Sequence, residues 1–335
     1  MRQLCRVRML IDIALVAIGV ALLGYGADLL VRGAVTVAKA ARLSAAVIGL
    51  TIVSMGTSLP ELTVSLAAAL KGSSDLSLGN VVGSNLFNIG VVLATSALVF
   101  PMRVHSSAVR LEWPFMFLVS FQLLLLARDG RLDRLEGGFF IVGLVLFTAY
   151  AVFIGRTAVA GEEAADLAEE VARFDVPPAG AVRPRASFAL AMGLIVGGIA
   201  LLMLGGEALV RGAVSLARSL GWSERVIGLT IVAAGTSAPE LATSIVAARK
   251  GQSEIALGNV IGSNIFNVLG ILGVTAVVRP LDVSASVLGT DLWWMLGLSA
   301  LLFPMMRTRY VVGRAEGGVL LALYITYVVV LLGQR

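Results

Sequence analysis

Two apolar stretches of this chain carry side chains whose oxygen atoms could bind a cation. In the first, a glutamate follows three hydroxyl residues at spacings of seven, four and three, which places all four on one face of a helix; the second has a serine and an asparagine four apart. These residues are Ser54, Thr57, Ser58 and Glu61, then Ser84 and Asn88. Oxygen ligands without histidine or cysteine suit hard ions such as Na+ and Ca2+, whereas transition metals favour nitrogen or sulfur.

The same pattern occurs a second time. The stretch from Gly56 to Asn88 recurs from Gly235 to Asn267, offset by 179 residues without a gap. The second copy supplies Thr236, Ser237, Glu240, Ser263 and Asn267, while Ala233 replaces the first serine. If the two copies meet in the fold, two carboxylates, two amides and several hydroxyls converge at one place.

The cost of burying the two glutamates argues that they have a function. An acidic residue at the centre of a membrane helix costs about 2.5 to 3.5 kcal/mol, and bound cations compensate this cost most directly. Pro60 and Pro239 each remove a helical hydrogen bond, which frees the carbonyls of Gly56 and Gly235 as further ligands. Hydroxyls that bond to their own helix and prolines that only kink it are the structural alternative, but they do not account for a repeated glutamate.

The elements that must position these residues are membrane-spanning helices. Of the 335 residues, 58% are hydrophobic, and apolar runs of about 20 residues, each long enough to cross a bilayer, recur throughout. The class is therefore an all-α membrane protein with about ten transmembrane helices. The predicted spans are 10–31, 45–70, 76–99, 109–127, 137–155, 188–210, 224–248, 255–278, 286–306 and 316–333.

Five spans fall in each half of the chain. Residues 1–155 form the first repeat with its hairpin at 45–99, and residues 188–335 form the second with its hairpin at 224–278. The polar, acidic and then proline-rich stretch 156–187 reads as the linker between them. An odd number of spans makes the second repeat enter the membrane from the opposite side, so the sequence predicts two inverted-topology repeats, as in secondary transporters.

Several smaller features support this architecture. Glycines four residues apart predict close helix approach in both hairpins. Asp28 with Arg32 and Glu207 with Arg211 are four apart, as intrahelical ion pairs are. The glycines are Gly79, Gly83, Gly258 and Gly262.

Composition also excludes some functions. The net charge of +5 belongs to loops and helix ends facing lipid headgroups, so the partner is the bilayer and not nucleic acid. The single Cys5 rules out an intrachain disulfide, and His105, the only histidine, is expected to be a solvated loop residue that builds no metal site. Without a second histidine an intramembrane hydrolase is disfavoured, so no enzyme activity is expected. The sequence also gives no sign of a cofactor or of an obligate protein partner.

The two hairpins resemble the alpha-repeats of the cation/Ca2+ exchanger superfamily, and their GTSxPE and GNVxGSNxFN stretches resemble its prokaryotic Na+/Ca2+ exchanger branch. The resemblance implies an antiporter that exchanges Na+ for Ca2+ by alternating access. It also implies a multi-pass cell-membrane protein, in the inner membrane of a bacterium, with the termini outside and the 156–187 linker cytoplasmic. By the same resemblance Glu61 and Glu240 bind both ions, helped by Thr57, Ser58, Ser84, Asn88, Thr236, Ser237 and Ser263.

One position departs from the family pattern. Some relatives carry aspartate where Asn267 stands, so this site holds only two formal negative charges, which one Ca2+ or two Na+ neutralise. An H+/Ca2+ exchanger that uses the same two glutamates is the alternative, because a desolvated glutamate can trade a proton for a cation. That branch typically has asparagine early in its motif, whereas Thr57 and Ser58 stand there and favour Na+. A passive channel is a further alternative that an inverted repeat fits less well.

Overall fold

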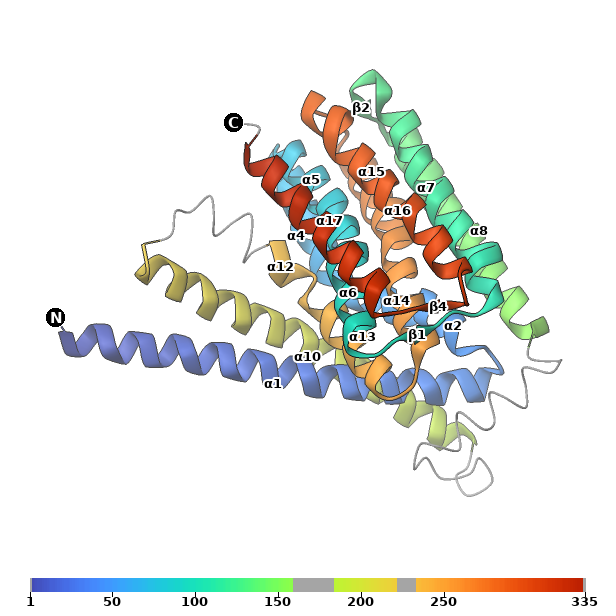
Figure 1. Cartoon of the computed structure of the whole chain (residues 1–335), viewed down its shortest axis with the longest axis horizontal. Helices are drawn as coiled ribbons and strands as arrows, with labels where there is room; N and C mark the ends of the chain where they lie inside the picture. Colours follow the sequence, from blue (N-terminus) through green and yellow to red (C-terminus); the bar gives the residue numbers. More distant parts are fainter. Residues whose placement is uncertain (1, 159–183, 222–232, 334–335) are drawn as a thin grey trace.

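The structure is a computed structural model that describes residues 2–158, 184–221 and 233–333. Nearly all of these residues are helical, and the helices form one bundle (Figure 1). The first half contains α1 (Arg2–Ala41), α2 (Ala45–Ile48), η1 (Gly49–Val53), α3 (Ser54–Thr57), α4 (Leu59–Leu70), α5 (Ser74–Phe87), η2 (Asn88–Leu93), α6 (Ala94–Val99), β1 (Met102–Arg103), η3 (Ala108–Glu112), α7 (Trp113–Leu126), η4 (Ala127–Asp129), β2 (Arg131–Leu132) and α8 (Arg134–Ala158).

The second half repeats most of this order. It contains α10 (Pro184–Ser219), α12 (Ala233–Thr236), α13 (Ala238–Arg249), α14 (Ser253–Phe266), η6 (Asn267–Leu272), α15 (Gly273–Val278), β3 (Leu281–Asp282), η7 (Val287–Asp291), α16 (Leu292–Arg307), β4 (Val311–Val312) and α17 (Arg314–Gly333). Elements η1, η2, η3, η6 and η7 are π-helical, and η4 is a 3-10 turn.

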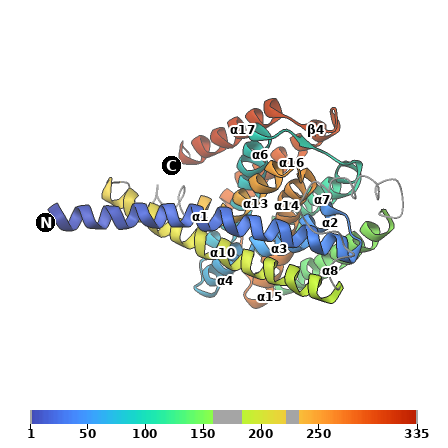
Figure 2. The same cartoon turned by 90° about the horizontal axis from the view of Figure 1, so that it is seen from below.

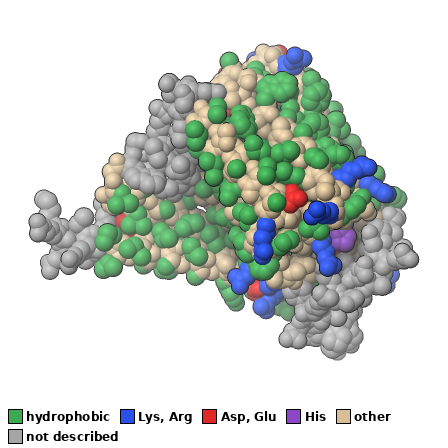
Figure 3. All heavy atoms as spheres, viewed as in Figure 1, with side chains coloured by type: hydrophobic (Ala, Val, Ile, Leu, Met, Phe, Trp, Pro, Cys, Tyr) green, Lys and Arg blue, Asp and Glu red, His purple; other side chains and the backbone are tan. Residues whose placement is uncertain are grey.

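The expected membrane class is confirmed. Within the described ranges, 8 helices are long and apolar enough to span a bilayer, and the bent pair Ala45–Thr57 and Leu59–Leu70 makes up to 9. The predicted span 224–248 begins inside the segment 222–232, and most of the 156–187 linker also lies outside the described residues. Figure 3 shows apolar side chains spread over one face of the molecule, as contact with lipid requires.

The first helix of each half is longer than the sequence predicted. Helix α1 includes an apolar span of 33 residues, Met9–Ala41, where 10–31 was expected. Such a helix is about 50 Å long against a hydrocarbon core of about 30 Å, so it must tilt. It crosses α10 closely through glycines: a Cβ on Gly26 would lie 2.9 Å from the Gly198 carbonyl oxygen. The two helices lie side by side along the bundle (Figure 2).

The repeats are inverted, as the odd span count predicts. Elements α5 and α14, with 14 residues each, begin 179 residues apart, and so do η2 and η6. Helices α1 and α10 run antiparallel, since Gly19 lies against Gly205 and Gly33 against Ala191. Each short strand pairs with a strand of the other half: β1 pairs with β4, and β2 pairs with β3. A twofold axis relating the halves explains all three observations.

Both hairpins break just before their prolines. Ser58, with φ −86° and ψ 10°, separates α3 from α4, and Ser237, with φ −91° and ψ 11°, separates α12 from α13. Pro60 and Pro239 then occupy the first turn of α4 and α13, where a missing N–H is tolerated. The first hairpin bends by 47° at this point. Each proline thus breaks its hairpin's first span, so that α4 and α13 begin in the middle of the bundle.

The predicted close approach of the hairpins is confirmed for one of them. A Cβ on Gly258 would lie 2.8 Å from the Ala46 carbonyl oxygen, and one on Gly262 would lie 2.5 Å from that of Leu50. The equivalent neighbours of Gly79 and Gly83 fall in 222–232, outside the described residues. His105, predicted to be a solvated loop residue, is only partly exposed, because the chain turns back over the start of α14 after β1 and brings His105 Nε2 against the Glu254 carboxylate.

Candidate functional site

The two glutamates lie at the breaks, in the middle of the bundle. Glu61 sits in the first turn of α4 and Glu240 in the first turn of α13, and each is only 1% exposed. The positive end of a helix dipole stabilises a negative charge there. The two side chains are also close enough to interact electrostatically. The half-helices therefore bring both carboxylates to one buried place, as the sequence repeat suggests.

Each glutamate is held by a serine from the other repeat. Ser237 Oγ donates to Glu61 Oε1 at 2.9 Å, and Ser58 Oγ donates to Glu240 Oε1 at the same distance. Ser84 Oγ lies 3.3 Å from Ser237 Oγ. Since Ser237 gives its single proton to Glu61, Ser84 is the donor in that contact. The two repeats thus build one shared site and not two separate ones.

Four asparagines extend the site where α5 continues into η2 and α14 continues into η6. Asn88 Nδ2 donates to Asn264 Oδ1 at 3.1 Å, and Asn267 Nδ2 donates to Asn85 Oδ1 at 2.9 Å. Asn85 also donates to the Asn264 backbone carbonyl at 3.3 Å. Because their amide groups are used as donors towards the opposite repeat, Asn88 and Asn267 keep their carbonyl oxygens free for another ligand.

A second pair of asparagines fixes the two half-helices. Asn80 Nδ2 donates to the Glu61 backbone carbonyl at 3.2 Å and to Ser65 Oγ at 2.9 Å. Asn259 makes the same two contacts in the other repeat, to Glu240 at 3.4 Å and to Ser244 at 3.0 Å. These contacts hold α4 against α5 and α13 against α14, so they set the orientation of both glutamates.

The site is rich in buried oxygen atoms that have no hydrogen-bond partner. Among the described side chains, no basic residue forms an ion pair with Glu61 or Glu240, although both carboxylates are buried. The unpartnered atoms of the site are Glu61 Oε2, Glu240 Oε2, Asn88 Oδ1, Asn267 Oδ1 and Ser263 Oγ. Unpaired buried oxygens are costly unless something binds them. An oxygen-ligated cation fits this set, since Ca2+ takes six to eight such ligands.

Most of the residues that the sequence singled out line this region. Thr57 is buried and lies 3.1 Å from Asn259 Oδ1 and 3.2 Å from the Ser54 carbonyl. Thr236 is half-buried and borders the cavity described below. Ser54 is different, because its hydroxyl donates to the Leu50 carbonyl of its own helix at 2.7 Å. Its contribution is thus to helix η1, which agrees with the alanine in the second repeat.

The sequence reading missed four asparagines. Asn80 and Asn85 recur as Asn259 and Asn264 at the offset of 179, within the repeated stretch, and this signal was available. No comparable sequence signal predicts the π-helical turns that begin at Asn88 and Asn267. Such turns are frequent at functional sites, and here they start at the asparagines with unpaired carbonyl oxygens.

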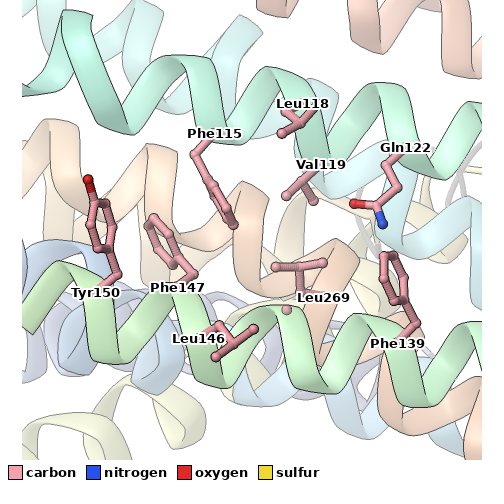
Figure 4. Close-up of a pocket in the computed structure, with 10 residues that line it drawn as sticks. Phe115, Leu118, Val119, Gln122, Phe139, Leu146, Phe147, Tyr150 and Leu269 are labelled. Atoms are coloured by element: carbon pink, nitrogen blue, oxygen red, sulfur yellow. The ribbon is translucent and has the colours of Figure 1, made fainter.

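A cavity lies beside the site, next to the breaks in the two hairpins. It has a volume of about 570 Å3 and lies between α4, α10 and the start of α13. Its lining includes Pro60, Thr63, Glu207, Arg211 and Thr236. A second cavity of about 340 Å3 lies between α7 and α8, where mostly apolar side chains face one another (Figure 4). The lining of the first includes Thr236, one of the predicted site residues, whereas the lining of the second includes none of them.

Known proteins are similar to this chain in sequence and in structure. The family model described as "Sodium/calcium exchanger protein" matches residues 11–153 and 190–333. The chain is 40% identical to the putative antiporter CaxA of Alkalimonas amylolytica over 288 residues, covering 85% of this chain and 87% of CaxA. It is 33% identical to the sodium/calcium exchanger MaX1 of Methanosarcina acetivorans, covering 86% and 89% of the two chains.

A solved structure shows the same fold. The sodium-calcium exchanger NCX_Mj superposes with a TM-score of 0.80 and 30% sequence identity, covering 96% of this chain and 98% of that one. The family model matches one segment in each half, which agrees with two inverted helical repeats joined at the middle of the chain. The chain is therefore a member of the sodium/calcium exchanger protein family.

Proposed function

We propose that this protein exchanges Na+ for Ca2+ across a membrane, and that both ions bind at the site between Glu61 and Glu240. The observation that carries the proposal is the set of unpaired oxygens around two buried carboxylates that lack a basic partner in the described ranges. The family is one of exchangers and not of catalysts, and the multi-pass helical architecture suits transport.

The ligand set favours hard cations. Glu61, Glu240, Asn88 and Asn267 offer carboxylate and amide oxygens, and Ser58, Ser84, Ser237 and Ser263 offer hydroxyls. These are ligands that Ca2+ prefers, and they also suit Na+. The two ions would compete for overlapping oxygens, so that occupation by one excludes the other. The proposed site also includes Thr57 and Thr236, beside Ser58 and Ser237. It does not include Ser54, whose hydroxyl bonds to a carbonyl of its own helix.

The choice of Na+ over H+ as the counter-ion is supported by the relatives. MaX1 and NCX_Mj are both named sodium/calcium exchangers. The serines that donate to the glutamates also matter, because a hydroxyl donor favours the charged carboxylate that a bound Na+ would need. We further propose, from the same family resemblance, that the protein lies in a bacterial inner membrane with its termini outside and the linker cytoplasmic.

Ion uptake into sealed liposomes distinguishes the two counter-ions. With Na+ inside and trace Ca2+ outside, we expect Ca2+ uptake that depends on the outward Na+ gradient. An outward proton gradient without Na+ should give no uptake above that of protein-free liposomes. Uptake driven by protons alone would contradict the proposal and would recast Glu61 and Glu240 as proton carriers.

The charge of the site also predicts the electrical behaviour of exchange. With asparagine at both Asn88 and Asn267, the two glutamates supply the formal negative charges of the site, which one Ca2+ or two Na+ neutralise. We therefore expect exchange of two Na+ for each Ca2+, so that Ca2+ uptake does not respond to an imposed K+ diffusion potential. Ca2+ uptake whose rate depends on the imposed potential would contradict this expectation. It would mean that a further Na+ binds to neutral ligands alone.

A further inference from the structure

Two equivalent acidic residues hold different partners in the two repeats. Asp28 on α1 and Glu207 on α10 are related by the offset of 179. The Asp28 carboxylate forms ion pairs with two basic side chains: Arg32 of its own helix, at 2.7 Å, and Lys250 at the end of α13. Among the described residues, Glu207 forms an ion pair only with Arg211, which lies on its own helix. Among the described residues, an ion pair therefore links the acidic residue to a second helix in one repeat and not in the other.

The missing partner of Glu207 can be identified from the repeat. Lys250 corresponds at the same offset to Lys71, which follows the last residue of α4. The Lys71 side chain is exposed and forms no ion pair with any described residue, whereas Lys250 is half-buried. The four residues therefore form two equivalent pairs, Asp28 with Lys250 and Glu207 with Lys71, of which only the first is formed.

The helices are also packed more closely around the formed pair than around the unformed one. Beside the formed pair, α1 lies along α13, and Val31 and Thr243 are fully buried. Their equivalents beside the unformed pair, Val210 and Val64, are only half-buried. Both line the cavity of about 570 Å3 that separates α10 from α4 and reaches Pro60 next to Glu61. Among the described residues, one side of the site is closely packed and carries an ion pair between helices, whereas the other side has a cavity.

We propose that the two ion pairs are alternative clamps: Asp28–Lys250 holds α1 on α13 when the site opens beside Thr63, and Glu207–Lys71 holds α10 on α4 when it opens on the opposite side. This inference rests on the proposed exchange function. Inverted repeats can swap conformations, so that each half adopts the arrangement now seen in the other. In that swapped state Lys71 meets Glu207 and Lys250 is released.

The clamps make the two states similar in energy. Each state gains one ion pair between helices and loses the equivalent one, while Arg32 and Arg211 lie one helical turn from the acidic residues on the same helices. A bound ion then shifts the equilibrium between the two states through its different affinity for each of them. Its binding energy does not have to offset the loss of an ion pair, because each state contains one. The four residues act as positioning residues, since none of them lies among the unpaired oxygens of the site.

Thiol labelling of purified protein in detergent tests the proposal. On a Cys5→Ser background the chain has no other cysteine, so Thr63→Cys reports the opening now seen, and its equivalent Ala242→Cys reports the opposite one. The measured quantity is the ratio of the two maleimide labelling rates, Thr63→Cys over Ala242→Cys. Lys250→Gln and Lys71→Gln are then introduced separately, as chemically identical changes at equivalent positions.

The two lysine variants should shift the ratio in opposite directions. Lys250→Gln removes the present clamp and should lower the ratio about two- to five-fold, while Lys71→Gln should raise it by a similar factor, as expected for a partly exposed pair. Lys250→Arg keeps the charge and should label like the unsubstituted protein. Shifts in the same direction, or no shift in either variant, would overturn the proposal. Labelling does not require transport, so a failure of the exchange function would show separately, as absent Na+-dependent Ca2+ uptake by the unsubstituted chain.

Discussion

Glu61→Gln is expected to abolish Ca2+ uptake while leaving the protein folded. The substitution keeps the shape of the side chain and its contact with Ser237, but it removes a formal negative charge from the buried site. It also replaces one oxygen by an NH2 group, which cannot bind a cation. Removing one member of a buried charge pair typically costs 2 to 5 kcal/mol, so we expect a loss of about 100-fold or more in Ca2+ uptake by proteoliposomes.

The inverted repeat supplies two controls for this experiment. Glu240→Gln should cause a loss of similar size, because Ser58 holds Glu240 as Ser237 holds Glu61. Asp75→Asn makes the same chemical change at an exposed position in the first turn of α5 and should leave uptake unchanged. Near-normal uptake by the Glu61→Gln protein would refute the assignment of the site.

Gly262→Ala is expected to give the largest loss of stability. A Cβ at this position would lie 2.5 Å from the Leu50 carbonyl oxygen and 2.7 Å from its Cα, both backbone atoms that cannot move aside without shifting η1. Overpacking of this kind costs on the order of 1 to 3 kcal/mol. Thermal unfolding of the purified protein should therefore occur at a clearly lower temperature than that of the unsubstituted chain.

The matched control lies in a helix that faces outward. Gly297 in the interior of α16 is exposed, and a Cβ there has no heavy atom within 4 Å. Gly297→Ala should be neutral or should stabilise the helix by about 0.5 to 1 kcal/mol, since alanine is the better helix former. Equal unfolding temperatures for the Gly262→Ala and Gly297→Ala proteins would show that α14 and η1 do not pack as closely as described.

Much of the fold could be predicted because its signals are local. The apolar runs gave the spans, the offset of 179 gave the two repeats, and the odd span count gave their inversion. The breaks at Ser58 and Ser237 followed from Pro60 and Pro239, since a proline cannot continue the hydrogen bonding of a helix. The convergence of Glu61 and Glu240 was expected if the two copies of the repeat meet in the fold, and the cost of burying each of them indicated a function.

The remaining features depend on contacts between the repeats. The spacing of Asn85 and Asn264 does not show that each bonds to the opposite hairpin, because the register between helices is set by packing. The length of α1 could not be derived from hydropathy either, since its extension to Ala41 depends on the glycine crossing with α10. Ser54 shares a helix face with Glu61, yet its proton goes to a backbone carbonyl, a choice that sequence spacing cannot reveal.

The reciprocal serine contacts have a consequence for how the chain is made. Glu61 emerges from the ribosome 176 residues before Ser237, the residue that donates to it. At a synthesis rate of about 5 to 20 residues per second, this carboxylate waits roughly 10 to 35 s for its partner. During that time the first half is already inserting with a glutamate that nothing from its own hairpin neutralises. Biogenesis therefore has to shelter an incomplete half-protein, and insertion factors or bound protons in this interval would decide how much of the nascent chain reaches the finished bundle.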